Sequence, residues 1–203
     1  MKKTTQTERP KIALFDFDGT LTHKDSFWAF LKFTHGKAGL LRHFMYLWPV
    51  LFLYKAGLLP NYRAKKIVFR HFYKNWPAPL FQEKSKLFCS QVLPKILNTK
   101  ALAKLNWHQK QGHRVVIVSA MFEPVLQPWC TENQVRLIAT KLEIKNGKIT
   151  GNFSSGNCYG QEKVSRIKLE GLLENKPFIY AYGDSAGDKP LLALADEAFY
   201  RKF

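Results

Sequence analysis

The sequence has little cysteine, and what it has is spread out. Cys89, Cys130 and Cys158 lie far apart and form no Cys-x-x-Cys pair. This pattern argues against a zinc or disulfide framework and favours a reducing compartment. The chain opens with basic residues but no apolar stretch, so we expect a disordered lead-in over residues 1–9 and no signal peptide. We therefore expect a cytoplasmic protein.

The sequence also lacks a long apolar run. The most apolar segment, residues 44–54, is bracketed by basic residues and is far shorter than the ~20 residues that span a bilayer. We expect it to be the core-facing part of a helix. The alternative is a helix lying peripherally on the inner membrane face, with Tyr46, Trp48 and Tyr54 at headgroup depth.

Acidic residues are scarce: the chain has 15, against 32 lysines and arginines, for a formal net charge of +17. From Lys24 to Lys100 there are 14 basic residues and only two acidic ones, Asp25 and Glu83, so 14 − 2 = +12 lies in this segment. Such a segment attracts phosphate groups on a substrate, an anionic membrane or a nucleic acid. A solvated basic face that serves solubility alone is the alternative.

The remaining composition, 46% hydrophobic and 14% aromatic over 203 residues, suits one domain that carries a sizeable insertion. Aromatic and basic residues alternate at helical spacing in the insertion, and prolines punctuate it. We expect a helical cap over residues 23–96, inserted into a Rossmann-like α/β core over residues 10–22 and 97–203. The expected cap helices are 26–33, 40–59 and 62–76.

The core segments alternate between helix and strand, which predicts a doubly wound parallel sheet. Three apolar strands end in polar residues: the first runs into Asp16 and Asp18, the second into Ser119, and the last long one into Asp184. The carboxyl ends of parallel strands are where open α/β sheets bind ligands. Further expected elements are helices 99–111, 124–134 and 160–174, strands 136–140 and 198–200, and a hairpin over 142–151 with Asn-Gly in its turn.

Asp16 and Asp18 occupy alternate positions, so their carboxylates project from the same side of the strand end. Gly19 follows and permits a sharp turn close to a ligand. Taken alone, Asp-Gly is also an ordinary turn dipeptide. A cluster of carboxylates without histidine or cysteine nearby suits Mg²⁺, because this ion prefers hard oxygen ligands.

Four motifs in order resemble the haloacid dehalogenase superfamily of phosphohydrolases. They are Asp-Phe-Asp-Gly-Thr at 16–20, Ser119 after its strand, Lys163 in Gly-Asn-Cys-Tyr-Gly-Gln-Glu-Lys, and Gly-Asp-Ser-Ala-Gly-Asp at 183–188. The helical insertion after the first motif is similar to the phosphoserine-phosphatase-like branch, subfamily IB. The 157–164 stretch and the aromatic insertion resemble a subgroup that includes a phosphatidylglycerophosphatase.

The resemblance implies a Mg²⁺-dependent phosphatase in which Asp16 is the nucleophile and forms an aspartyl-phosphate. Asp18 is the expected acid and base, and Ser119 and Lys163 are expected to stabilise the phosphoryl oxygens. Asp188 is expected to bind the metal or to orient Lys163. The expected metal ligands are Asp16, Asp18, Asp184 and Asp188, and the expected substrate-binding residues are Gly19, Thr20, Asp25 and Ala120.

Each of these assignments has a structural alternative. Ser119 and Asp188 are also typical helix caps, and Lys163 is also an ordinary surface helix residue. Asp25 occupies the position of a substrate-binding carboxylate in phosphoserine phosphatases, but it is shorter than the usual Glu and suits a helix cap. The six histidines show no ligand spacing.

Three functions follow from these patterns. The first is hydrolysis of a small phosphate monoester of the phosphoserine kind. The second is the same chemistry on a lipid phosphate, with the cap on an anionic membrane. The third is a nucleic-acid-binding protein with a vestigial site, which the intact set of acids disfavours.

Overall fold

Five parallel strands form the central sheet in the order β3-β2-β1-β6-β7. The computed structural model describes residues 9–203. The predicted lead-in therefore lies outside the described residues except for Arg9, which donates to the carbonyl of Pro177 and pairs with Asp196. The strands are β1 (Lys11–Phe15), β2 (Arg114–Phe122), β3 (Arg136–Thr140), β6 (Phe178–Gly183) and β7 (Glu197–Tyr200).

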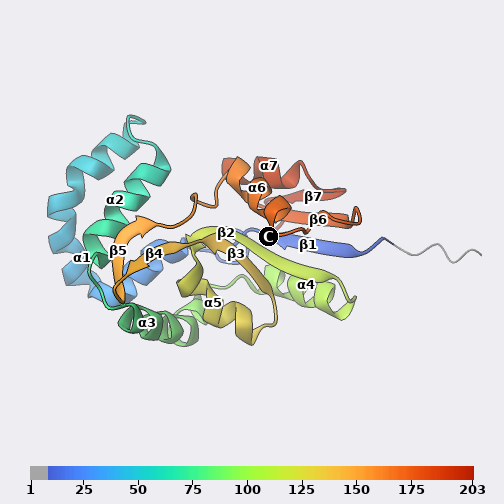
Figure 1. Ribbon diagram of the computed structural model, residues 1–203, viewed down its shortest axis with the longest axis horizontal. Helices are drawn as coiled ribbons and strands as arrows, with labels where there is room; N and C mark the ends of the chain where they lie inside the picture. The colour runs from blue at the N-terminus through green and yellow to red at the C-terminus, as the bar shows by residue number, and fades with distance from the viewer. Residues whose placement is uncertain (1–8) are drawn as a thin grey trace, which may run out of the picture.

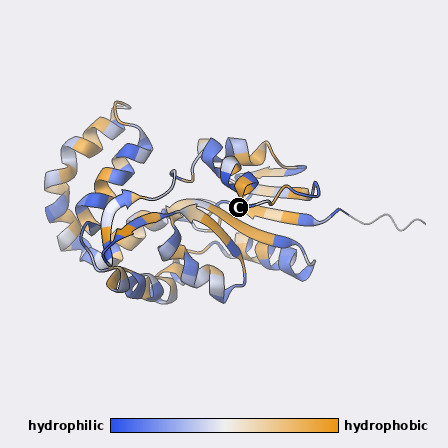
Figure 2. Cartoon of the chain, viewed as in Figure 1, coloured by the Kyte–Doolittle hydropathy of each residue, from blue (hydrophilic) through white to orange (hydrophobic). Residues whose placement is uncertain are grey.

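The central strand β1 is buried on both faces, because its side chains alternate between two apolar clusters. Ala13 and Phe15 belong to one cluster and Ile12 and Leu14 to the other. Figure 1 shows α4 and α5 on one side of the sheet and α6 and α7 on the other, and the strands are largely apolar (Figure 2). The predicted doubly wound α/β fold is confirmed. The four helices that cover the sheet are α4 (Thr99–Lys110), α5 (Glu123–Glu132), α6 (Gln161–Leu169) and α7 (Lys189–Leu192). Short 3-10 turns lie at Leu93–Lys95 and Ala186–Asp188.

Three helices between β1 and α4 form the cap: α1 (Ser26–Lys55), α2 (Asn61–Tyr73) and α3 (Ala78–Gln91). The break expected between the first two cap helices is a kink inside α1, where Gly36 has φ 68°. That conformation suits glycine because it has no Cβ. Aromatic side chains pack together inside the cap: Phe30 is fully buried, and its ring lies 5.3 Å from those of Phe81 and Phe88. They belong to the same buried cluster as Phe15 of β1.

A hairpin outside the main sheet also packs on the cap. It consists of β4 (Leu142–Lys145) and β5 (Lys148–Phe153), and Asn146 and Gly147 in its turn have positive φ, as the Asn-Gly signal predicts. The N–H of Asn75 donates to the carbonyl of Ile149 at 2.8 Å. The predicted boundaries counted this segment with the core, whereas its backbone bonds join it to the cap. The division at residues 23–96 otherwise stays a prediction.

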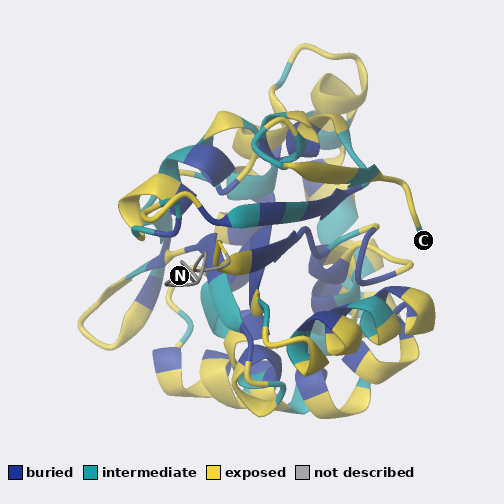
Figure 3. Ribbon diagram, turned by 90° about the vertical axis from the view of Figure 1, so that its right-hand side faces the viewer, coloured by how far each residue is buried: buried dark blue, intermediate teal, exposed yellow. Residues whose placement is uncertain are grey.

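The expectation that residues 44–54 face the core is wrong for most of their large side chains. Leu47 is buried, but Met45, Tyr46 and Trp48 are 65%, 71% and 62% exposed. Figure 3 shows this contrast more widely, with dark blue strands inside and yellow outer faces on the helices. No helix in the described part of the chain is long and apolar enough to cross a membrane.

Candidate active site

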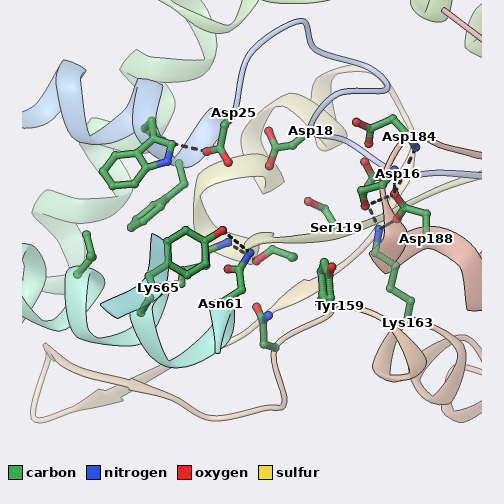
Figure 4. Close-up of a pocket in the computed structure, with 18 of the residues that line it drawn as sticks. Asp16, Asp18, Asp25, Asn61, Lys65, Ser119, Tyr159, Lys163, Asp184 and Asp188 are labelled. Carbon is green, nitrogen blue, oxygen red and sulfur yellow. Dashed lines mark hydrogen bonds and ion pairs between the residues drawn. The ribbon is translucent and has the colours of Figure 1, made fainter. Parts of the chain in front are cut away.

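The candidate site begins where β1 ends. The N–H of Asp16 donates to the carbonyl of Tyr182 at 2.9 Å, which holds Asp16 level with the end of β6. The turn that follows needs a glycine: Gly19 has φ +81°, and a Cβ there would lie 2.2 Å from Oδ2 of Asp184. The first motif and the last are therefore packed directly against each other (Figure 4).

Lys163 reaches this point from the first turn of α6. Its fully buried ammonium lies 2.5 Å from Oδ1 of Asp16 and 2.6 Å from Oδ1 of Asp188. Burial lowers the pKa of Lys163, but the two carboxylates outweigh burial and raise it, so the ammonium stays charged. The surface-lysine alternative for Lys163 is excluded.

Asp188 uses both carboxylate oxygens within the site. Oδ1 accepts from Lys163, and Oδ2 accepts from the N–H and the hydroxyl of Ser185, the latter at 2.6 Å. Burial raises the pKa of Asp188, but Lys163 and these hydrogen bonds reverse that effect and lower it. The geometry thus favours a positioning role toward Lys163. Asp188 makes no side-chain capping bond to α7, so the helix-cap alternative does not hold; its bonds to Ser185 instead close the preceding 3-10 turn.

Asp184 is the carboxylate that lacks a partner. Its Oδ1 is buried and accepts no hydrogen bond from any described residue. Burial and the nearby charge of Asp188 raise its pKa. Asp16, Asp184 and Asp188 each offer a carboxylate oxygen, and these oxygens lie within 4.8 Å of one another. Among the described residues, these three aspartates form the cluster that could hold a metal ion. An orphaned buried oxygen among hard donors fits Mg²⁺.

Burial and neighbouring charges also raise the pKa values of Asp16 and Asp18, the two aspartates of the first motif. Burial, partly offset by Lys163, raises the pKa of Asp16 to about 7. Burial and the charge of Asp25 raise that of Asp18 to about 6, although its Oδ1 accepts from the N–H of Ser26 at 2.7 Å. A carboxyl group with a pKa near 6 can both give and take a proton at neutral pH.

The neighbouring strand β2 brings Ser119 and Ala120 to the same edge. Ser119 is 1% exposed, and its hydroxyl accepts from the N–H of Met121 at 3.0 Å. That bond leaves the hydroxyl proton free to be donated to a ligand. Ser119 lies inside a strand, so the helix-cap alternative does not hold.

These residues line a cavity of about 250 Å³ between the core and the cap. Of the predicted substrate-binding residues, Asp25 and Ala120 line it, whereas Gly19 and Thr20 lie behind Asp184 and line a separate small hollow. Asp25 also caps α1 by accepting from the N–H of Trp28 at 3.1 Å. The cap contributes Phe27, Trp28, Leu51, Tyr54, Asn61, Ala64, Lys65 and Val68 to the wall, and the loop before α6 contributes Asn157 and Tyr159.

Lys65 is the main residue of the cavity that sequence reasoning missed. It extends from α2, donates to the carbonyl of Ala120 at 2.8 Å, and lies 5.3 Å and 5.0 Å from the ring centroids of Phe27 and Phe122. Burial lowers its pKa, and Asp18 and Asp25 counteract that shift. The sequence showed that Lys65 belongs to an amphipathic helix, but it did not show that the Lys65 side chain points into the cavity.

Five of the six histidines, for which no ligand spacing was found, gather in two places away from this cavity, and His23 is exposed by itself. In the cap, Nδ1 of His43 lies 2.9 Å from Nε2 of His71, with the ring of His35 nearby. In the core, His108 is fully buried between His113 and Tyr182, at 2.8 Å and 2.9 Å.

Comparisons with known proteins agree with this arrangement. The family model for haloacid dehalogenase-like hydrolases matches residues 13–193. Protein CicA of Caulobacter vibrioides is 34% identical over 199 residues, which cover 96% of this chain and 87% of CicA. A crystal structure of a protein with unknown function from Bordetella pertussis Tohama I has a TM-score of 0.78 and 27% identity, covering 91% of this chain and 86% of that one.

A phosphoserine phosphatase solved as a phospho-aspartyl intermediate analogue has a TM-score of 0.60 and 21% identity. The match covers 93% of this chain and 84% of the phosphatase chain. At this level of identity the similarity establishes the shared fold.

Proposed function

Because this chain belongs to the haloacid dehalogenase-like hydrolase family, we propose that it hydrolyses phosphate monoesters through an aspartyl-phosphate on Asp16. The observation that carries the proposal is the arrangement of Asp16, Lys163 and Asp184. A carboxylate at the end of the central strand is paired with a buried ammonium and adjoins an unpartnered acid. A phosphorylated substrate needs this combination, because its own negative charge repels an unaided nucleophile.

In the first step a carboxylate oxygen of Asp16 attacks phosphorus, and the bond to the leaving oxygen breaks. Asp18 donates its proton to that oxygen, which its raised pKa permits. Lys163 and the free hydroxyl proton of Ser119 face the same edge and would donate to the phosphoryl oxygens. Both contacts would gain strength as negative charge develops in the transition state.

In the second step Asp18, now a carboxylate, takes a proton from water. That water attacks the phosphorus of the aspartyl-phosphate, which releases inorganic phosphate and restores Asp16. The same residue thus acts as acid and then as base. Asp188 keeps Lys163 in place through both steps by means of the 2.6 Å ion pair.

Asp16 and Asp184, together with the backbone carbonyl of Asp18, would hold Mg²⁺. The bound ion would offset the negative charges of phosphate and nucleophile. Asp188 was also expected as a ligand, but its oxygens already accept from Lys163 and Ser185, so we assign it to positioning.

For the substrate we favour a small phosphorylated metabolite, because the cavity holds about 250 Å³ and cap side chains form much of its wall. Asp25 and Lys65 supply one charge of each sign to the cavity wall, as a zwitterionic phosphoserine-like compound would require. Placement in the phosphoserine-phosphatase-like branch is part of this proposal. So is a cytoplasmic location, which three free, buried cysteines favour.

A second candidate is a lipid phosphate of the phosphatidylglycerophosphate type. It is favoured by the exposure of Met45, Trp48 and Phe52 on the helix whose Leu51 and Tyr54 line the cavity.

The experiment that tests the proposal measures phosphate release from p-nitrophenyl phosphate by the purified protein. Activity should vanish in EDTA, return with Mg²⁺, and fail to return with Ca²⁺, whose larger and looser shell misplaces the oxygens. Asp184→Asn should raise the Mg²⁺ concentration needed. Full activity after exhaustive chelation would contradict the metal assignment, and a screen of phosphorylated metabolites and lipids would separate the two substrate classes.

A further inference from the structure

Four large apolar side chains form a stripe on the outer cap helix. Leu41, Met45, Trp48 and Phe52 are separated by four, three and four residues, a spacing that places them on one face of α1. They are 70%, 65%, 62% and 62% exposed. Figure 1 shows this helix at the outer edge of the cap, away from the sheet.

Single exposed apolar residues are ordinary, but a continuous apolar face is not. Leu169 on α6 is an example of the ordinary kind: it is 85% exposed and has no exposed apolar residue beside it on its helix. Tyr46 on the same helix and Leu58 just past it are also exposed, at 71% and 72%.

The charge around the stripe has one sign. No acidic residue occurs between Asp25 and Glu83. Lys37 lies four residues before Leu41 and Lys55 three residues after Phe52, so a lysine stands at each end of the stripe on its own side of the helix. The basic residues of this acid-free segment are Lys32, Lys37, Arg42, Lys55, Arg63, Lys65, Lys66, Arg70 and Lys74.

This charge pattern distinguishes between possible binding partners of the stripe. A second copy of the chain docked through the same face would bring two cationic surfaces together, which is unfavourable. An anionic bilayer instead offers apolar depth for the stripe and phosphates for the lysines. Tryptophan in particular is favoured at headgroup depth, and lysine extends its ammonium toward the interface.

We propose that the stripe Leu41, Met45, Trp48 and Phe52, flanked by Lys37 and Lys55, docks the cap on the surface of anionic membranes. The inner side of the same helix lines the cavity through Leu51 and Tyr54. Docking would therefore hold the cavity beside the lipid headgroups. The proposal concerns where the protein binds and stands independently of the hydrolysis proposed above.

The test is co-sedimentation of the full chain with vesicles of phosphatidylcholine alone or with added phosphatidylserine. Binding is expected only with phosphatidylserine and should weaken as salt rises. The paired variant Trp48→Ser/Phe52→Ser should lose binding about tenfold or more. Lys37→Gln/Lys55→Gln should lose about fivefold for each lysine. The control, Leu169→Ser, removes a still more exposed apolar side chain from the surface of α6 and should bind like the parent.

Hydrolysis of p-nitrophenyl phosphate and circular dichroism show whether each variant is folded, since none of these residues lines the cavity. Three results would overturn the proposal: no binding to phosphatidylserine vesicles, equal binding by the folded Trp48→Ser/Phe52→Ser variant, or a dimer in solution that this variant converts to a monomer. The last result would identify the stripe as a contact between copies.

Discussion

Each side of the cavity contributes one buried lysine, and the two lysines differ in the partners that their ammonium groups have. On the core side, Lys163 is held by Asp16 and Asp188 at 2.5 Å and 2.6 Å. On the cap side, Lys65 donates to a backbone carbonyl and forms no ion pair with any described residue. A paired lysine is fixed for one task, whereas an unpaired one can bind an anion that arrives with a ligand. Under the proposed function, the core side would hold the phosphoryl group and the cap side the remainder of the substrate.

The largest effect should come from the core side. Asp16→Asn removes the proposed nucleophile and should lower kcat by roughly 10⁴-fold or more, with unchanged circular dichroism. Asp18→Asn should instead slow both leaving-group departure and breakdown of the intermediate. Mass spectrometry of the protein quenched during turnover should find phosphate on Asp16. Unchanged turnover by Asp16→Asn would contradict the mechanism.

The next comparison concerns stability, and it contrasts the inside of the cap with its outside. Phe30→Ala empties a fully buried aromatic site and should lower the free energy of unfolding by about 3–5 kcal/mol. Trp48→Ala, at a side chain 62% exposed, should change it by no more than about 0.5 kcal/mol. Urea denaturation measures both. A large loss for Trp48→Ala would mean that the stripe on α1 is covered within the fold.

The two lysines provide the sharpest kinetic comparison. Lys163→Met leaves Asp16 without its charge partner and should lower kcat by about 10²–10³-fold on every phosphate ester, p-nitrophenyl phosphate included. Lys65→Met should lower kcat/KM by about 10-fold or more on a substrate with a second anionic group, and change p-nitrophenyl phosphate hydrolysis little. Equal losses from Lys65→Met on both kinds of substrate would show that the cap lysine also serves the phosphoryl group.

The smallest expected effect is on the stability of the fold at acidic pH, through His108. Burial, with the charges of Lys104 and His113, lowers the pKa of His108 from 6.5 to about 3. The folded protein therefore keeps His108 neutral while the unfolded chain takes up a proton below pH 6.5. The stability it contributes is complete above that pH and is lost as the pH falls toward 3. At pH 5, which is 1.5 units below the unfolded pKa, the loss should be at most about 2 kcal/mol, and urea denaturation of His108→Gln should show a flatter pH dependence between 7 and 5. The same slope in the variant would assign the acid effect to other groups, such as His35 in the cap.

Local patterns in the sequence were sufficient for much of the fold. Alternating apolar strands and helices predicted the parallel sheet, and Asn146-Gly147 predicted the hairpin turn, because φ > 0 is a local requirement. The position of Asp16, Ser119 and Asp184 at strand ends predicted that they would meet, since parallel strands bring their carboxyl ends to one edge. The structure brings them together, and their chemical roles remain predictions for the experiments above.

Only the tertiary structure decided which faces of the cap are covered. Residues 44–54 are apolar on nearly every side, so their periodicity could not show that Leu47 is buried and Trp48 exposed. Lys65 meets the carbonyl of Ala120, 55 residues away in the chain, and no local signal encodes such a contact. Helical spacing fixes which side chains share a face, but burial depends on the neighbour that the fold places against that face.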